Sequence, residues 1–353
     1  MKKTIKKLLS LVMALTLVGA VLAGCSNSGS GGGDSSSGNS GTTEQKTYFY
    51  VAAGLGESYS YDMIIGLKHA AAQYGCKIVP MGANDWDSKV ANEALEGAVA
   101  QKPDGIITAA WDTGMNPGIE KAMAAGIPVV LVEAHSGNEG NVYIGLDNVD
   151  AGRETADTLI SLAGESGKLL VMGNWGSTNI DDKFVGLKEV LADHPGWEIV
   201  GDEDGDCEAE TSLRVAKDLI NNHPEATAFV GLDSACGAAI GTAMEELGKD
   251  PSSLTVICAD REDAMLDYIR KGYVDASLTN RTAAMCYMAV EFLESVTNHD
   301  FLNVPVTGDN AGSDVSPFPL HVFTGNVIIN KDNVDNFDHA NLKMEDYDTP
   351  LYG

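Results

Sequence analysis

Short apolar runs alternate with segments of helical periodicity along most of this chain. The first four runs are Tyr48 to Ala53, Lys77 to Met81, Gly105 to Ala109 and Pro128 to Val132. After the first run, Ile64, Leu67 and Ala71 recur at helical spacing, so they form one apolar stripe on a helix. Strands that alternate strictly with helices predict an α/β fold with parallel sheets and right-handed crossovers.

The same alternation begins again in the second half of the chain. Its runs are Lys168 to Met172, Glu198 to Val200, Thr227 to Gly231, Leu254 to Ala259 and Asp275 to Leu278. A chain of about 300 residues beyond its leader is more typical of two cores than of one. Gly145 lies where a fifth run, at Ile144 to Asn148, gives way to a helix, and it tolerates the dihedral change that a hinge needs.

The N-terminal residues combine lysines with an apolar stretch, from Leu8 to Leu22, that is too short for an ordinary membrane span. This pattern predicts a secretory signal peptide over residues 1–24. Leu22-Ala23-Gly24-Cys25 resembles a bacterial lipobox, in which the thiol of the new N-terminal Cys25 takes a diacylglycerol; the alternative is an ordinary cleaved signal. Residues 25–46 then form a Ser/Gly-rich flexible linker, because they lack large apolar side chains.

The formal net charge of −28 almost excludes a nucleic-acid partner, because phosphate binding needs a basic face. Five cysteines remain besides Cys25, without CxxC or metal-ligand spacing, so we expect no disulfide framework. Asp202, Asp204 and Asp206 have the spacing of a calcium loop but lack its glycine and its last acid. We therefore expect no metal and no cofactor.

Several stretches, in this order and spacing, resemble the ribose-type (type I) periplasmic binding proteins, the solute receptors of ABC transporters. They are Tyr50 to Ala53, Lys102 to Ile107, Ala125 to Val130, Gly145 to Gly152 and Val327 to Val334. The resemblance implies two doubly wound parallel-sheet lobes joined by a three-segment hinge. It places residues 47–147 and 281–320 in the N-terminal lobe, and 148–280 and 321–353 in the C-terminal lobe. The hinge would lie near Gly145, Asn148, Asn280 and Asn330.

Ligands of doubly wound sheets bind outside the carboxyl ends of the strands, so the residues just after each run are the candidates for ligand binding. Most are polar or aromatic, which suits the hydroxyl rim and the CH face of a sugar. The candidates are Glu57, Tyr59, Trp111, Asp112, Glu133, His135, Asn174, Trp175, Asp181, Asp233, Asp260 and Asn280.

The resemblance adds that Asp260 and Asn280 match positions that hydrogen-bond sugar hydroxyls, and that Glu133 stands where an aspartate is usual. The alternatives are that Asp260 caps the following helix, and that Tyr59 and Trp111 are packing aromatics.

The chain departs from the ribose-type pattern at three positions. Ala134 and Asp181 stand where arginines are frequent, and Cys207 stands where an aromatic residue is expected. The resulting acidic cleft should repel anions, and burying its carboxylates unpaired would be costly. Either the ligand is rich in hydrogen-bond donors, or one of the basic residues turns inward; these are Arg153, Lys183, Arg261 and Arg281. Because Arg261 and Arg281 directly follow Asp260 and Asn280, we expect a neutral sugar or polyol ahead of an amino sugar or another cation.

These features predict a receptor, anchored by lipid in the cell envelope, that captures a sugar or polyol and delivers it to an ABC permease. The alternative is a sensory protein that reports a sugar-like or cationic ligand to a membrane kinase or chemoreceptor. A secreted hydrolase or deaminase is disfavoured, because no nucleophile with a partner base stands out. We therefore expect no enzymatic activity.

Overall fold

The computed structural model describes residues 45–56, 59–138, 140, 142–298 and 319–338. The chain from Glu44 onward forms one compact unit. The predicted signal peptide, Cys25, nearly all of the predicted linker and the candidate Glu57 lie outside the described residues. In the part of the chain that the structure describes, no helix is long and apolar enough to cross a membrane.

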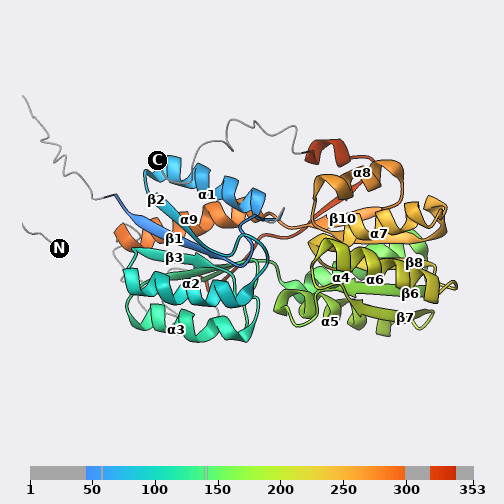
Figure 1. The fold of residues 1–353 in the computed structure, drawn as a ribbon, viewed down its shortest axis with the longest axis horizontal. Helices are drawn as coiled ribbons and strands as arrows, with labels where there is room; N and C mark the ends of the chain where they lie inside the picture. The colour runs from blue at the N-terminus through green and yellow to red at the C-terminus, as the bar shows by residue number, and fades with distance from the viewer. Residues whose placement is uncertain (1–44, 57–58, 139, 141, 299–318, 339–353) are drawn as a thin grey trace, which may run out of the picture. The chain divides into compact units, whose positions relative to one another are not determined.

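The first lobe, which holds the strands labelled β1, β2 and β3 in Figure 1, is built on a six-stranded parallel sheet with the strand order β11-β5-β4-β3-β1-β2. Its strands are β1 (Thr47–Ala52), β2 (Lys77–Gly82), β3 (Gly105–Thr108), β4 (Val129–Val132), β5 (Val142–Gly145) and β11 (His321–Phe323). Its helices are α1 (Ser60–Tyr74), α2 (Ser88–Gln101), α3 (Asn116–Ala124) and α9 (Thr282–Asn298), with a short 3-10 helix η1 (Thr113–Met115). Alternate strand residues face opposite ways, so Tyr48 packs with α1 and α9 while Phe49 packs with α2 and α3.

The second lobe repeats this design with the strand order β12-β10-β9-β8-β6-β7, in which only the edge strand β12 is antiparallel among the described pairings. Its strands are β6 (Gly167–Gly173), β7 (Trp197–Asp204), β8 (Ala228–Gly231), β9 (Thr255–Ala259), β10 (Ala276–Thr279) and β12 (Val327–Asn330). Its helices are α4 (Asn148–Ala163), α5 (Thr178–Ala192), α6 (Ala209–Asn222), α7 (Ser234–Glu246) and α8 (Asp263–Lys271), with the 3-10 helices η2 (Pro251–Ser253) and η3 (Val334–Phe337). Helices α6, α7 and α8 cover one face of this sheet, and α4 and α5 cover the other.

The predicted fold class, two doubly wound parallel-sheet lobes, is confirmed. Within the described residues the chain passes between the sheets after β5, after β10 and after β11. Gly145, Asn148 and Asn280 lie at the first two passages, as expected. The third passage differs from the prediction, because β11 pairs with β5 and so belongs to the first sheet. The lobe boundary therefore lies after Phe323 rather than after residue 320, and Asn330 ends β12 instead of lying at the passage.

Helices α4 and α5 approach closely because glycines face each other's backbone. A Cβ atom on Gly152 would lie 1.9 Å from the carbonyl oxygen of Lys183. We expect Gly152→Ala to lower the free energy of unfolding by about 1 to 3 kcal/mol or more, the usual cost of overpacking, in urea denaturation. The control is Gly97→Ala in α2, where the nearest atom, Met81 Cε, is 3.8 Å away. That variant should be neutral or slightly stabilising, and equal losses in both would contradict the close-approach explanation.

Candidate ligand-binding site

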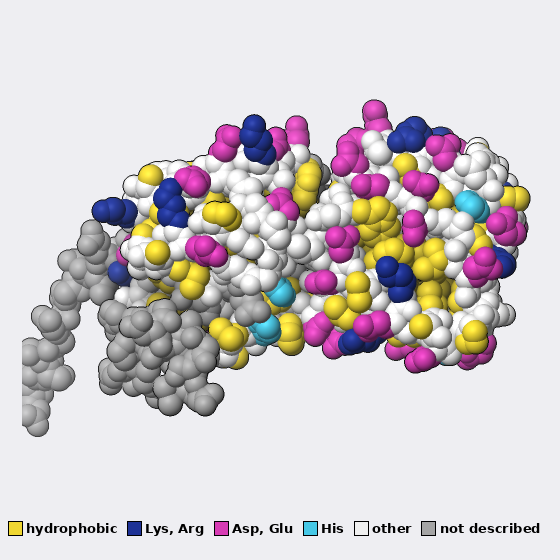
Figure 2. Space-filling model, turned by 90° about the horizontal axis from the view of Figure 1, so that it is seen from below, with side chains coloured by type: hydrophobic (Ala, Val, Ile, Leu, Met, Phe, Trp, Pro, Cys, Tyr) yellow, Lys and Arg dark blue, Asp and Glu magenta, His cyan; other side chains and the backbone are white. Residues whose placement is uncertain are grey.

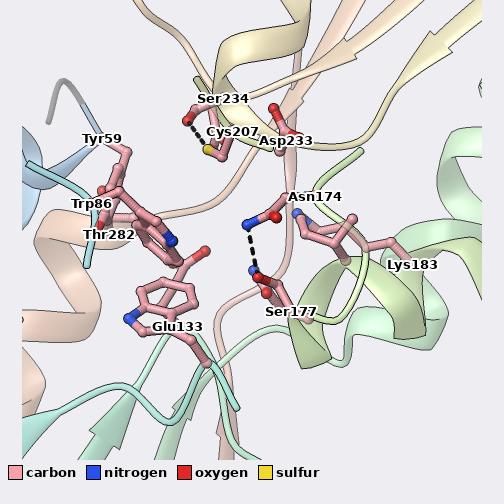
Figure 3. A pocket seen from close by; sticks show the side chains of 14 residues that line it. Tyr59, Trp86, Glu133, Asn174, Ser177, Lys183, Cys207, Asp233, Ser234 and Thr282 are labelled. Atoms are coloured by element: carbon pink, nitrogen blue, oxygen red, sulfur yellow. Dashed lines mark hydrogen bonds between the residues drawn. The ribbon is translucent and has the colours of Figure 1, made fainter. Parts of the chain in front are cut away.

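The carboxyl ends of strands from both sheets surround one cavity that opens to solvent and measures about 460 Å³ with the open solvent at its mouth included (Figure 3). The first lobe contributes an aromatic side and the second lobe a mostly polar side. The lining residues are Tyr59, Trp86, Trp111, Glu133, Asn174, Ser177, Asn179, Ile180, Lys183, Cys207, Asp233, Ser234, Asp260 and Thr282. Six of the twelve predicted ligand-binding residues are among them, which is the arrangement expected at the carboxyl ends of doubly wound sheets.

Three aromatic rings form one side of the cavity. The ring centroids of Trp86 and Trp111 are 5.2 Å apart, and Tyr59 lies 6.2 Å from Trp86 and 6.0 Å from Trp111. All three pairs meet edge to face, which is a favourable arrangement for aromatic pairs and holds the rings in place. Tyr59 and Trp111 pack on one another, as the alternative expected, and they also line the cavity, so ligand binding by these rings stays a prediction.

Glu133 follows β4 with a positive φ of 68°, and its side chain is 8 % exposed. Asn280, at the end of β10, donates hydrogen bonds from Nδ2 to both carboxylate oxygens of Glu133, at 2.7 and 2.6 Å. Burial and the nearby Asp260 carboxylate raise the pKa of Glu133 to about 7, although Lys183 and the Asn280 hydrogen bonds oppose the shift. Asn280 thus lies outside the main lining and connects the two lobes through Glu133.

Asp233 precedes α7 and caps it, because its Oδ1 accepts hydrogen bonds from the backbone N–H groups of Ala235 and Cys236. Its Oδ2 atom is buried and has no hydrogen-bond partner among the described residues. Burial is the main cause that raises the pKa of Asp233 to about 6. The second carboxylate oxygen is therefore an acceptor that faces the cavity without a donor.

Asp260 follows β9 with a positive φ of 66° and lines the cavity. Burial raises the pKa of its carboxyl group, and Lys183 partly offsets this rise. The N-cap position of α8 belongs to Glu262, so the alternative in which Asp260 caps that helix is not what the structure shows. The Asp260 side chain is left available to a ligand.

The first two turns of α5 supply much of the second lobe's side of the cavity. Ser177 occupies the N-cap position, and its Oγ accepts a hydrogen bond of 2.9 Å from Asn174 Nδ2. Asn179 and Lys183 are both buried, and Lys183 extends from the helix toward the cavity (Figure 3). The same turn meets the first lobe, since the backbone N–H of Thr178 donates to the carbonyl of Trp111 at 3.0 Å.

Two predicted acids lie outside the lining, and each accepts a hydrogen bond from a backbone N–H group close by in the chain. Asp112 caps η1 and accepts a hydrogen bond of 2.7 Å from the N–H of Gly114. Asp181 accepts one of 3.1 Å from the N–H of Gly176. Short acidic side chains after a strand commonly close such turns, so position alone did not distinguish these two from Asp233 and Asp260.

Two predicted rings also lie outside the lining. The Trp175 ring stacks on Phe184 of α5 with centroids 4.9 Å apart. The His135 ring packs against Tyr143 with centroids 4.5 Å apart, and its Nδ1 is buried without a hydrogen-bond partner in the described chain. Both rings are therefore engaged in packing beside the cavity rather than in it.

Sequence reasoning missed several lining residues, namely Trp86, Ser177, Asn179, Ile180, Ser234 and Thr282. Two more lining residues were not among the predicted ligand contacts: Lys183 was expected only as a possible inward cation, and Cys207 only as a departure from the family pattern. Most of these residues lie in a cap or in the first turns of α5, α7 and α9 rather than directly after a strand. Trp86 follows β2, and none of the predicted candidates lies after that strand. A search that included these helix starts would have found them.

The basic residues expected to neutralise the cleft mostly point elsewhere. Arg261 Nε donates to Asp62 at 2.6 Å across the two lobes. Arg281 donates to the carbonyl of Thr324, and Arg153 is exposed and paired with Glu189. Only Lys183 of the four lines the cavity. The described residues also contain no group of His, Cys, Asp or Glu side chains that could hold a metal ion.

Comparison with known proteins agrees with this architecture. Residues 48–300 match the family model described as a periplasmic binding protein domain. The ribose import binding protein RbsB of Bacillus subtilis (strain 168) is 23 % identical over 82 % of this chain and 93 % of that protein.

Two solved structures have the same fold. A sugar ABC transporter (sugar-binding protein) from Bacillus halodurans has a TM-score of 0.74 and 27 % identity over 83 % of this chain and 100 % of that chain. The glucose-galactose binding protein GanP from Geobacillus stearothermophilus has a TM-score of 0.74 and 21 % identity over 82 % of this chain and 99 % of that chain. With two doubly wound lobes and a family match over most of its length, this chain belongs to the periplasmic binding protein domain family.

Proposed function

We propose that this protein is an extracytoplasmic receptor that captures a monosaccharide or polyol between its lobes and delivers it to an ABC permease without converting it chemically. The observation that carries the proposal is the composition of the cavity, in which three aromatic rings from one lobe face hydrogen-bonding side chains from the other. Aromatic faces suit the CH surface of a sugar ring, and the carboxylates and amides suit its hydroxyl rim.

The relatives support the same class of ligand. The similar proteins include the ribose import binding protein of Bacillus subtilis and the D-apiose import binding protein of Actinobacillus succinogenes. The apiose protein is 21 % identical over 59 % of this chain and 67 % of that protein. In this proposal the signal peptide directs export, the lipid on Cys25 holds the receptor at the outer face of the membrane, and the Ser/Gly-rich segment lets it reach the permease.

A ligand panel tests the proposal. Purified protein would be mixed with pentoses, hexoses, inositols, amino sugars and the uronate and phosphate derivatives of the sugars at pH 7, and the melting temperature would be recorded by differential scanning fluorimetry. A ligand that binds only the folded state raises the melting temperature by mass action. At a ligand concentration of 100 Kd the free energy of unfolding increases by about 2.7 kcal/mol. We expect uncharged or amine-bearing sugars or polyols to give the largest rise.

Anionic derivatives are expected to give little or no rise. Acidic side chains predominate over basic ones on the face in Figure 2, and the cavity itself holds Glu133, Asp233 and Asp260 against Lys183. A like charge in such a site is repelled. If no sugar or polyol raised the melting temperature, the proposed function would be wrong; if phosphates or uronates gave the largest rise, the charge argument would be wrong.

A further inference from the structure

The charges in the cavity do not balance. Glu133, Asp233 and Asp260 line it together with a single basic side chain, Lys183. Arg261, the basic residue directly after Asp260, is instead bound to Asp62 and to the carbonyl of Phe337. Carboxylates that are buried near each other disfavour one another's charged forms. A second positive charge in the cavity would therefore stabilise these three carboxylates.

Two acceptor atoms of the lining residues also have no donor. Asp233 Oδ2 and Asn179 Oδ1 are buried acceptors without partners among the described residues, in side chains that are 4 and 5 % exposed. Lys183 Nζ has no hydrogen bond or ion pair within the described part of the chain, so it does not satisfy them. Buried acceptors are normally paired, so a ligand that brings donors to these two atoms would be favoured.

The aromatic side of the cavity suits positive charge as well as a sugar face. Trp86, Trp111 and Tyr59 meet edge to face, so ring faces and edges of the cluster border one space. The face of an aromatic ring attracts a cation, most strongly when the ring is an indole. Acids on one side and indoles on the other are the two elements that hold an ammonium group in proteins.

We infer that the preferred ligand is a monosaccharide or polyol carrying a primary amine, whose ammonium group lies against Asp233 and is shared with Asp260 and Glu133. The inference rests on the proposed function and specifies its ligand class. An ammonium group supplies three donors, which matches the free acceptors, and one positive charge, which reduces the imbalance. The charge of Lys183 also favours the ionised forms of Glu133 and Asp260, and no bond is made or broken.

Matched ligands test this directly by isothermal titration calorimetry at pH 7. The probes are D-glucose and D-galactose, their 2-amino-2-deoxy and 6-amino-6-deoxy derivatives, and the N-acetylated forms of these amines. We expect at least one amine to bind about tenfold or more tightly than its parent sugar, a difference of about 1.4 kcal/mol. Acetylation removes the charge and should abolish the advantage.

Proton linkage gives a second readout. Glu133 and Asp233 have raised pKa values of about 7 and about 6, and Asp260, Lys183 and Asp62 are the other charged groups that act on this set. An ammonium group beside these acids lowers their pKa values, so an amine should release protons on binding at pH 7. A neutral sugar should release none. Titrations in two buffers of different ionisation enthalpy measure how many protons are released or taken up on binding.

Asp233→Asn is the variant that locates the amine. Asparagine caps a helix as well as aspartate, so α7 should still form, while the charge on the free oxygen is removed. The ratio of amine to parent affinity should fall close to one in this variant. The control is Asp202→Asn, which removes an exposed acid from β7 of the same lobe and should leave the ratio unchanged.

The outcomes separate the inference from the proposed function. If the parent sugars bound as tightly as every amine, or if amines released no protons, the amine inference would be overturned while the receptor function stood. An unchanged affinity ratio in a folded Asp233→Asn protein would likewise overturn it. Failure of every sugar, polyol and amine to bind would overturn both.

Discussion

Replacing Asp260 by alanine is expected to weaken binding of the tightest ligand in the panel by about 1 to 3 kcal/mol, which is about fivefold to more than a hundredfold in Kd. Asp260 lines the cavity, its carboxylate has no hydrogen-bond partner among the described residues, and Glu262 holds the N-cap position of α8. Removing it leaves a buried donor of the ligand unpaired. Titration calorimetry, or the fluorescence of Trp86 and Trp111 in the cavity wall, measures the loss.

The backbone at this position requires a matched control. Asp260 has a φ of 66°, a conformation that aspartate tolerates better than alanine, so the variant also carries local strain. Asp206 is a second aspartate with a positive φ, 55°, and its side chain is exposed and outside the lining. Asp206→Ala should therefore lose similar stability and retain its affinity. Near-native affinity in Asp260→Ala would show that the ligand lies elsewhere.

The fold could be predicted from the chain because strand and helix periods alternate without a break, and because buried parallel strands are nearly continuous apolar runs. The short edge strands were harder. His321–Phe323 is three residues long, partly exposed, and placed in the first sheet only by its pairing with β5. Such a partner lies far away in the sequence, so no local pattern places the lobe boundary after Phe323.

The candidate site was predictable to the extent that it follows strand ends. Glu133, Asp233 and Asp260 were found in this way, whereas Asp112 and Asp181 follow the same rule but bind the backbone of their own loops. Whether an acid after a strand faces a ligand or closes a turn depends on backbone geometry that composition does not report.

The sequence also did not predict where the arginine side chains point. Arg261 is next to Asp260 in the chain, which made it a plausible counter-ion for the cleft. The structure instead pairs it with Asp62, 199 residues away and in the other lobe. A side chain this long finds its partner through tertiary structure, and the charge of the cavity changes as a result.

Replacing Glu133 by glutamine is expected to change the free energy of unfolding of the ligand-free protein, and this change should favour the variant more at high pH than at low pH. The pKa of Glu133 is raised from 4.5 to about 7, so the folded state holds a proton that the unfolded state has already lost between these values. Stability is therefore lost as pH rises from 4.5 to about 7, and the loss is complete above that pH. At 1.36 kcal/mol per unit, the ionised side chain costs about 3 kcal/mol, which the amide avoids.

The measurement is the difference in unfolding free energy between variant and wild type, from urea denaturation at pH 4, 5, 6, 7 and 8. This difference should change in favour of Glu133→Gln by about 3 kcal/mol across the series, whatever constant offset the altered bond to Asn280 adds. Glu208→Gln is a control of opposite sign, because the backbone N–H groups of Thr211 and Glu210 lower the pKa of Glu208, so its charged form stabilises the protein. Glu208→Gln should lose stability above the ordinary pKa and not below it. Parallel curves for Glu133→Gln and wild type would show that Glu133 ionises freely in the cavity, and would remove the main reason to expect that a ligand must neutralise it.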